Sequence, residues 1–585
     1  MAAPEIVLGG GKRTQPRSRG VRTALVAIAL VVLALTVAYI VFRRATTYSV
    51  PEGSTKGTLR AEGTRLVWDA DDAASTLERL GDLWVLRAAG EPFRLGVAQG
   101  RLLGALAKAD DEWDAVLAAE PSGVFAHTRR DARLRWAHRD LADAIPEPLR
   151  REIAGVAAAL PETSYQARVW HQAALDVGRV DGDQDSPAGG LTSALAFLAP
   201  PATPAKPASA PSGGRSAAEP PQRKPPAPEA GPPRLIVGRS FGPAGAWPPA
   251  PVLVSFVRPT GAIAFAKIGW AGQLGAVTGI NAEGLLVAVD PAAAEGEGAG
   301  DGVPVALLGR LVLERARNLD EAIALLTELR PLGAAAFLLV DGPRGAWAIV
   351  ERGPDGISVA RGKPRAAIAD FLASQEFAKD AENARIKRAR RGEARLARLH
   401  ELIAAPAATS PAEGVLAALR DRRGPGGAPL PAWSAQAVAN LGAQHTVIVD
   451  VSEMVLWVSD GLGAAGPLRA FDLRAELRGE APRAVAALSA DPELGADEQA
   501  VLRAALAELA DATRLARAGH PERASEAAWR ALALAPDLAL PHQILGDAAR
   551  EVGDVPRARA HYRRFLELGP PDEGSADAVR AYLGL

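Results

Sequence analysis

An uninterrupted run of uncharged residues, Ala24 to Phe42, most constrains how this chain can fold. At 1.5 Å per residue, an α-helix of that length spans about 28 Å, close to the ~30 Å hydrocarbon core of a bilayer. The run closes with Tyr39, Phe42 and Arg43, residue types that anchor helices at the membrane interface. We therefore predict one transmembrane helix over residues 23–43. A cleaved signal peptide is the alternative, although its apolar region is usually shorter.

Basic residues flank this run on both sides, with a small excess before it. Those before it are Lys12, Arg13, Arg17, Arg19 and Arg22, and those directly after it are Arg43 and Arg44. The positive-inside rule then favours a cytoplasmic tail over residues 1–22 and a body on the other side of the membrane. Heavy use of Ala, Arg, Gly and Pro, with little Lys, indicates a GC-rich bacterial genome. We expect a single-pass protein of the bacterial inner (cytoplasmic) membrane with a periplasmic or extracytoplasmic body.

The chain contains no cysteine, which excludes disulfides, thiolate metal ligands and cysteine nucleophiles. Its eight histidines show no metal-ligand spacing, and no phosphate-binding loop is present. We therefore predict neither a metal site nor a cofactor. The formal net charge of −1 also gives no reason to expect a nucleic-acid partner.

Composition divides the remaining residues into segments. Residues 44–65 are polar and predict a tether, and residues 66–480 alternate helix-like and strand-like patterns, as an α+β domain does. Residues 199–234 consist largely of Pro, Ala, Ser and Gly and cannot bury enough apolar surface to offset their ordering entropy. We predict that they form a disordered insertion between two strand-like runs, Leu191–Leu198 and Leu235–Val237.

The predicted elements follow from hydrophobic periodicity. Helices are expected over residues 73–83, 149–160, 304–317, 319–329 and 376–404. Strands are expected over residues 252–257, 262–268, 285–289, 335–340, 346–350, 446–451 and 454–458.

The C-terminal segment, residues 495–585, contains an internal repeat in which matched residues recur at one fixed spacing. The matched pairs are Gly519 and Gly553, Arg523 and Arg557, Ala524 and Ala558, and Pro536 and Pro570. This spacing resembles the period of tetratricopeptide repeats, which stack helical hairpins and often offer a concave face to a protein partner. An ordinary pair of helical hairpins is the alternative.

Several motifs follow one another between residues 90 and 475. They include Gly90–Gly96, Gly190-Leu191-Thr192-Ser193, Gly238–Gly242, Gly279-Ile280-Asn281-Ala282-Glu283-Gly284-Leu285 and Phe471-Asp472-Leu473. In this order they resemble the N-terminal nucleophile (Ntn) hydrolases related to acyl-coenzyme A:6-aminopenicillanic acid acyltransferase. The resemblance implies a four-layer αββα sandwich and hydrolysis or transfer at an amide bond. In active members a Cys exposed by chain cleavage attacks the amide, its own α-amino group acts as the base, and Asn side chains stabilise the oxyanion.

The resemblance also indicates that the catalytic set is incomplete. It places Leu191 at the nucleophile position, and a leucine side chain has no lone pair with which to attack a carbonyl. It places Gly242 where the family has an Asp that orients the amine, and Ala369 where it has an oxyanion Asn. Asn281 remains, either as an oxyanion donor or as a turn residue, and Arg239 remains, either as a substrate-binding residue or as an ion-pair partner.

The leading hypothesis is therefore a membrane-anchored, catalytically degenerate homologue that binds an acylated small molecule or peptide, or a protein through its repeats. An active amide hydrolase or acyltransferase with Thr192 as the N-terminal nucleophile after self-cleavage is one alternative. An assembly scaffold that acts through the repeats alone is another. Sequence leaves open whether the protein is an enzyme.

Overall fold

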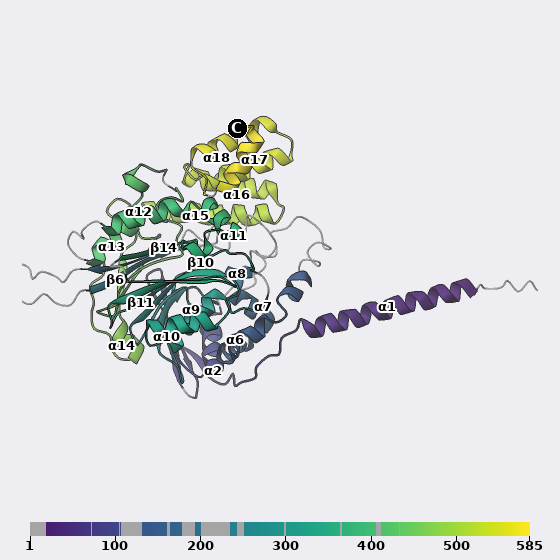
Figure 1. Ribbon diagram of the computed structural model, residues 1–585, viewed down its shortest axis with the longest axis horizontal. Helices are drawn as coiled ribbons and strands as arrows, with labels where there is room; N and C mark the ends of the chain where they lie inside the picture. Colours follow the sequence, from purple (N-terminus) through teal and green to yellow (C-terminus); the bar gives the residue numbers. More distant parts are fainter. Residues whose placement is uncertain are drawn as a thin grey trace, which may run out of the picture. The chain divides into compact units, whose positions relative to one another are not determined.

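The computed structural model describes residues 19–585 except residues 72, 105, 107–131, 161–163, 178–192, 200–233, 243–250, 298–299, 363–364, 405–410, 432 and 572. The chain divides into two compact units, Met1–Thr47 and Tyr48–Leu585. The first unit contains the long helix α1, Arg19–Ala45 (Figure 1). Its segment Thr23–Ala45 has a mean hydropathy of 3.0 and no buried residues in its most apolar part. By length and composition α1 is a candidate membrane span, although a signal sequence would have the same properties.

Two β-sheets form the centre of the second unit. The larger sheet has the order β1-β2-β3-β4-β7-β8-β9-β10-β11-β12-β13, and all of its neighbours are antiparallel except the parallel pair β4 and β7. Its strands are β1 Thr58–Glu62, β2 Arg65–Asp69, β3 Ala74–Leu80, β4 Leu83–Gly90, β7 Leu253–Pro259, β8 Phe265–Gly269, β9 Thr278–Asn281, β10 Leu285–Ala292, β11 Ala334–Asp341, β12 Ala346–Arg352 and β13 Ile357–Arg361. The smaller, antiparallel sheet has the order β14-β5-β6-β15-β16-β17. Its strands are β5 Ser193–Ala199, β6 Arg234–Phe241, β14 Arg365–Ala369, β15 His445–Asp450, β16 Val455–Ser459 and β17 Leu468–Asp472.

The central strands are hydrophobic on both faces because each face is covered. In β11, Phe337 and Leu339 belong to a core shared with helices, whereas Leu338 and Val340 belong to a core shared with the smaller sheet. This alternation follows the two-residue period of a strand. β6 behaves in the same way, with Val237 facing the larger sheet and Ile236 facing a third core on the outer side.

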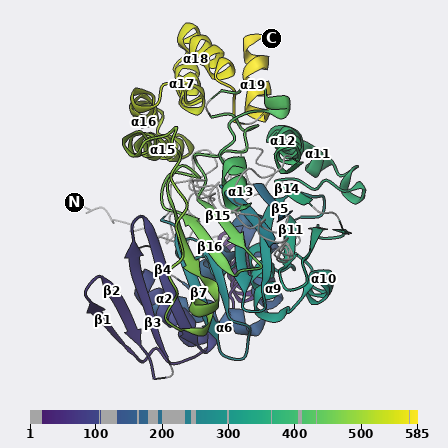
Figure 2. The ribbon, with the colours of Figure 1, turned by 90° about the vertical axis from the view of Figure 1, so that its left-hand side faces the viewer.

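Helices cover the outer face of each sheet (Figure 2). Those that share the first core with the larger sheet are α2 Pro92–Leu103, α6 Glu147–Ala159, α9 Val305–Arg315 and α10 Leu319–Glu328. Those that share the third core with the smaller sheet are α12 Gly392–Ala404 and α13 Pro411–Leu419. The shorter helices α5 Leu141–Ala144, α7 Tyr165–Gln172, α8 Ala174–Val177, α11 Ala381–Ala389 and α14 Leu473–Arg478 connect or flank these layers, as do the 3-10 turns η1 Gln375–Phe377 and η2 Pro425–Gly427.

The predictions for α6, α9 and α10 and for strands β7, β8, β10–β12, β15 and β16 are confirmed to within a few residues. The helix predicted over residues 73–83 is wrong, because this segment forms β3 and the start of β4. Its exposed and buried residues alternate with a period of two, and Gly81, with a φ of 65°, makes the hairpin turn between the strands. The single helix predicted over 376–404 is also wrong, because Arg391 has a φ of 52° and separates α11 from α12.

The predicted tether over residues 44–65 is only partly free of structure. Thr58–Glu62 forms β1. Tyr48 is buried within the first core, where its hydroxyl donates to the carbonyl of His138. The predicted disordered insertion over 199–234 lies almost wholly outside the described residues, except that Ala199 ends β5 and Arg234 begins β6.

The C-terminal helices are α15 Ala496–Arg517, α16 Pro521–Leu534, α17 Leu540–Glu551, α18 Val555–Glu567 and α19 Glu573–Leu583. Gly519 and Gly553, which are one repeat period apart, have φ angles of 72° and 79° and occupy equivalent turns between helices. Ala524 and Ala558, another matched pair, are both fully buried. These two pairs therefore have matched environments, whereas Pro536 is exposed and its match Pro570 is buried, and the assignment to tetratricopeptide repeats remains a prediction.

Candidate functional site

The site that the resemblance implies lies where β5 begins. Ser193, the first residue of β5, pairs with Ser240 of β6 on one side and with Ala369 of β14 on the other. The candidate nucleophile Thr192 and the neighbouring Leu191 precede Ser193 and lie outside the described residues. Beside Ser193 lie the ends of β6 and β14, and the start of β15 pairs with the end of β6.

Arg239 of β6 is wholly buried and bonded to the opposite sheet. Its Nη1 donates to the carboxylate of Asp290, at the end of β10, and its Nη2 donates to the Val289 carbonyl at 2.6 Å. Burial lowers the pKa of Arg239 to about 9, and the negative charge of Asp370 opposes this shift. Arg239 thus has the ion-pair role that sequence analysis left open, and its role in binding a substrate remains a prediction. Asp290 belongs to no recognised motif, so sequence analysis could not identify it as the partner.

Gly242, which the resemblance places where the family has an amine-orienting Asp, has limited room for a side chain. A Cβ atom on Gly242 would lie 2.6 Å from the Asn440 side-chain nitrogen and 3.0 Å from the Ala443 Cα. A side chain at position 242 would therefore require the end of the Asn440 side chain to move and the backbone at Ala443 to shift by a few tenths of an ångström.

Asn281, the candidate oxyanion donor, uses its amide group to hold a helix end and a turn. Its Nδ2 donates to the carbonyls of Leu313 and Ala316 at the C-terminus of α9, at 3.1 and 2.8 Å. Its Oδ1 accepts from the backbone N–H groups of Glu283 and Leu285 at 3.1 and 3.0 Å. Helix C-termini leave carbonyls without intrahelical partners, and Asn281 satisfies two of them. Both of its amide hydrogens are engaged, so the oxyanion role stays a prediction that this geometry disfavours.

The end of β14 carries a second buried ion pair. Ala369, which the resemblance places at the family's other oxyanion position, offers only a methyl group, but the next residue, Asp370, bonds through its carboxylate to Arg395 of α12. Arg395 also donates to the Ala435 carbonyl. Both charged side chains are almost completely buried, so this pair fixes the edge of the smaller sheet to its covering helix.

His445, at the start of β15, lies in an aromatic group beside Arg239. Its ring stacks on Phe241 with centroids 5.3 Å apart, and Phe241 stacks in turn on Trp270 at 6.1 Å. The Nδ1 of His445 contacts Gln444 Oε1 at 2.6 Å, and its Nε2 contacts the Thr278 hydroxyl at 2.9 Å. Because a carboxamide oxygen only accepts, Nδ1 carries the proton and Nε2 accepts from Thr278, which is the neutral form. Sequence analysis missed His445, since no motif surrounds it.

Acid is expected to destabilise the protein through His445. Burial, followed by the positive charge of Arg239, lowers the pKa of His445 well below its ordinary value. Below about pH 6.5 the unfolded chain therefore binds a proton that the folded chain does not. The stability that the neutral His445 contributes is thus fully present above that pH and is lost as the pH falls below it. One such group costs about 1.4 kcal/mol per pH unit. The free energy of unfolding of the full-length protein is measured at pH 7 and at pH 5. It should fall less between these two pH values for His445→Gln than for the exposed-site control His520→Gln. Equal losses in the two variants would contradict this assignment.

A surface cavity of about 420 Å³ adjoins this region on the outer side of the smaller sheet. It is lined by the loop after β14 and by residues of α11 and α12, including Phe371, Lys387 and Glu393. The ammonium of Lys387 lies 5.9 Å from the centre of the Phe371 ring and 3.0 Å from Glu393. The cavity thus presents an aromatic face next to charges of both signs.

Part of the chain matches a known family. Residues 251–459, which contribute strands to both sheets, match the model of the acyl-coenzyme A:6-aminopenicillanic acid acyl-transferase family. A search of curated proteins finds no match.

Solved structures similar to this chain include an N-acylethanolamine-hydrolyzing acid amidase ortholog from Caenorhabditis elegans. That similarity has 13% identity and a TM-score of 0.28, and it covers 45% of this chain and 93% of the amidase. Two variants of the conjugated bile acid hydrolase from Clostridium perfringens are also similar, with 12% and 11% identity and TM-scores of 0.28. They are covered over 93% and 97% of their length, and this chain over 43% and 45%.

Proposed function

We propose that this protein is a membrane-anchored, catalytically degenerate Ntn-hydrolase-like acyltransferase or amidase homologue whose body binds an acylated small molecule or peptide without cleaving it. The family match over residues 251–459 supports the acyltransferase-like class. The two sheets covered by helices on their outer faces support a four-layer αββα arrangement. The length and hydropathy of α1 support the anchor.

The observation that carries the loss of catalysis is the crowding at Gly242. In the family mechanism an Asp orients the new N-terminal amine, and here backbone of the 440–443 loop stands 3.0 Å from where even a Cβ would be. Leu191 supplies no nucleophile, and the surviving Arg239 is committed to Asp290. The packing around the site is therefore built for residues that lack the catalytic groups.

Self-cleavage is the direct test, because the Ntn mechanism needs a free α-amino group on the nucleophile. Intact mass and N-terminal sequencing of the full-length protein should show one uncut chain. Leu191→Cys should not hydrolyse amides, because Gly242 supplies no carboxylate to orient the amine that cleavage would free. Two fragments from the wild type, with the second beginning at Thr192, would sink the proposal and establish the Thr192 enzyme.

Binding is tested separately with a panel of N-acylated amino acids and short N-acylated peptides. At least one compound should raise the thermal unfolding midpoint of the full-length protein in detergent, because a ligand that binds only the folded state stabilises it. Hydrolysis products should be absent from the same samples. Binding accompanied by turnover would favour the enzyme instead. If no acylated probe binds and the C-terminal helices retain a protein partner, the scaffold would be favoured.

A further inference from the structure

Only a short piece of chain separates the end of α1 from a residue that is buried in the body. Tyr48 is buried, its hydroxyl donates to the His138 carbonyl at 2.6 Å, and it accepts from Trp170 Nε1 at 3.0 Å. The last residue of α1 is Ala45, shortly before Tyr48 in the chain. Three extended residues span only ~10 Å. Wherever α1 leaves the bilayer, the segment around His138 must therefore follow closely.

That segment exposes a tryptophan. Residues 132–137 form a short helix in which Leu134 is buried, as is His138 directly after it, and the Trp136 side chain is 49% exposed. The Arg139 guanidinium lies 4.9 Å from the centre of the Trp136 ring and donates to the Trp136 carbonyl at 2.9 Å. The buried residues fix the helix to the core, so the indole is held outward on a rigid support.

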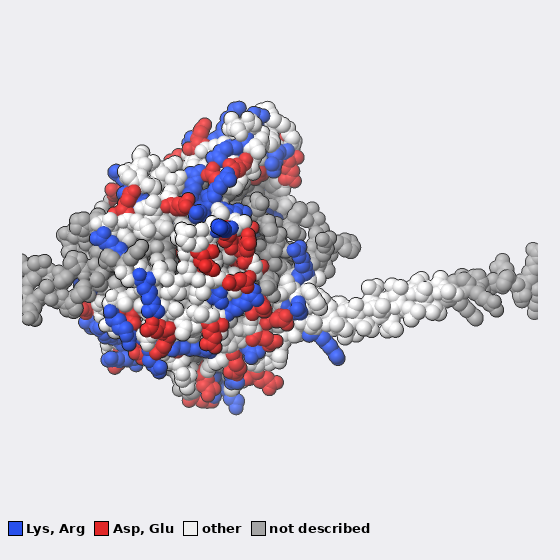
Figure 3. All heavy atoms as spheres, viewed as in Figure 1, with Lys and Arg blue, Asp and Glu red and all other residues white. Residues whose placement is uncertain are grey.

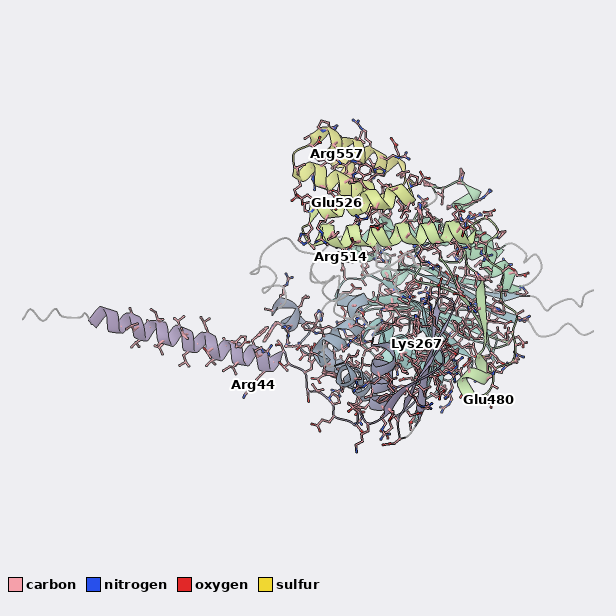
Figure 4. All side chains as sticks on the ribbon, turned by 180° about the vertical axis from the view of Figure 1, so that it is seen from behind. Arg44, Lys267, Glu480, Arg514, Glu526 and Arg557 are labelled. Atoms are coloured by element: carbon pink, nitrogen blue, oxygen red, sulfur yellow. The ribbon has the colours of Figure 1, made fainter. Side chains whose placement is uncertain are left out.

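The surroundings of Trp136 are mainly basic. Arg133, Arg135 and Arg139 lie on this segment, with Asp140 as the acidic residue that follows Arg139. Tryptophan favours the headgroup region of a bilayer because its ring is apolar and its N–H is polar. Guanidinium groups bind phosphate through paired hydrogen bonds and are attracted by anionic lipids. In the chain, Arg43 and Arg44 close α1 a few residues before Tyr48 (Arg44 is labelled in Figure 4).

We propose that the Trp136 patch, defined as Arg133, Trp136 and Arg139, docks onto anionic phospholipid headgroups of the membrane that holds α1. The proposal rests on the membrane anchor of the proposed function. It makes the body a membrane-apposed domain with one fixed face toward the lipid. On the face of the body seen in Figure 3, charges of both signs are interspersed.

The absence of cysteine makes a depth measurement straightforward, since each introduced thiol can be labelled alone. Full-length protein with a fluorophore at Asp140→Cys is reconstituted in nanodiscs of phosphatidylcholine and phosphatidylglycerol that carry one quencher in the headgroup region and a second quencher in the acyl chains, which reaches the centre of the bilayer. Matched labels at Leu33→Cys in α1 and at Val552→Cys, which is 74% exposed in the C-terminal helices, serve as controls. We expect quenching at positions 33 and 140 and none at position 552.

The controls separate the two proposals. Quenching at 33 without quenching at 140 would overturn the docking of the patch and leave the anchor intact. No quenching at 33 would overturn the anchor and the docking with it. Changing both Arg133 and Arg139 to Gln should lower the docking equilibrium constant by about fivefold for each arginine charge removed. Removing phosphatidylglycerol should have an effect of the same size, because the arginines then lose their anionic partners. If neither change reduces quenching at position 140, the role of anionic lipid is overturned. The arginine variant should keep the wild-type unfolding midpoint, which excludes misfolding as the cause of reduced quenching.

Discussion

Replacement of Arg310 with methionine is expected to destabilise the body by about 3–5 kcal/mol, the usual effect of removing one partner from a buried ion pair. Arg310 of α9 donates from Nη1 to Glu152 Oε1 at 3.0 Å and from Nε to Glu314 at 2.8 Å, and all three side chains are nearly inaccessible. Burial alone lowers the pKa of Arg310, but the charges of Glu152 and Glu314 outweigh burial and raise it. Without Arg310, two carboxylates would remain buried with their main cation gone.

Lys267, which lies deep in the body (Figure 4), joins the same network. Its Nζ donates to the carbonyls of Gln273 and Gly275, and burial together with the charge of Arg310 lowers its pKa to about 7. Lys267 is therefore not placed to substitute for Arg310, because its ammonium is bonded to these two backbone carbonyls.

The effect is measured by thermal or urea unfolding of full-length protein in detergent, followed by tryptophan fluorescence. Arg330→Met is the matched control, because Arg330 pairs with Asp301 at 2.9 Å on the surface, where an ion pair contributes at most about 1 kcal/mol. The double variant with Arg310→Met and Glu152→Gln should recover part of the loss. A loss for Arg310→Met no larger than that of the control would contradict the network.

Gly155→Ala is expected to destabilise the body by about 1–3 kcal/mol or more, although alanine is the better helix former by about 1 kcal/mol. A Cβ on Gly155 of α6 would lie 2.0 Å from the Phe93 carbonyl oxygen of α2. The reciprocal contact is equally short, since a Cβ on Gly96 would lie 2.0 Å from the Glu152 carbonyl oxygen. Both neighbours are backbone, so the two helices would have to separate.

Gly495→Ala tests the interpretation of this crossing, because a Cβ at Gly495 meets nothing within 4 Å. The same unfolding experiment should show a small change for Gly495→Ala and a large loss for Gly155→Ala. A stabilised Gly155→Ala variant would mean that helix propensity, and not the close approach of α2 and α6, decides the effect.

Local pattern predicted the elements whose own residues determine their burial. Strands β10 to β12 are mainly apolar runs, and α9 and α10 have a helical period, so both kinds of element were predicted to within a few residues. The segment 73–83 was mistaken for a helix because its short alternation is recognisable only beside its partner β4. The tether was overestimated because the burial of Tyr48 depends on His138 and Trp170, which lie far along the chain.

The site shows the same division between local and distant information. The motif around Asn281 was visible, but its role in capping α9 depends on carbonyls at the far end of that later helix. The partner of Arg239 and the position of His445 are set by the packing of one sheet on the other. The prediction that the nucleophile is missing, by contrast, depends only on the identity of residue 191.

The parallel pair of β4 and β7 has a consequence for the order of folding. Trp84 pairs with Leu253, which is distant in the chain, and β4 connects β1–β3 to the rest of the larger sheet. Bringing such distant segments together costs loop-closure entropy and slows folding. During synthesis β1–β4 leave the ribosome before β7. The edge of β4 that pairs with β7 stays unpaired until β7 has been made. The strands nearest α1 in sequence are thus the ones that a chaperone would need to shield longest.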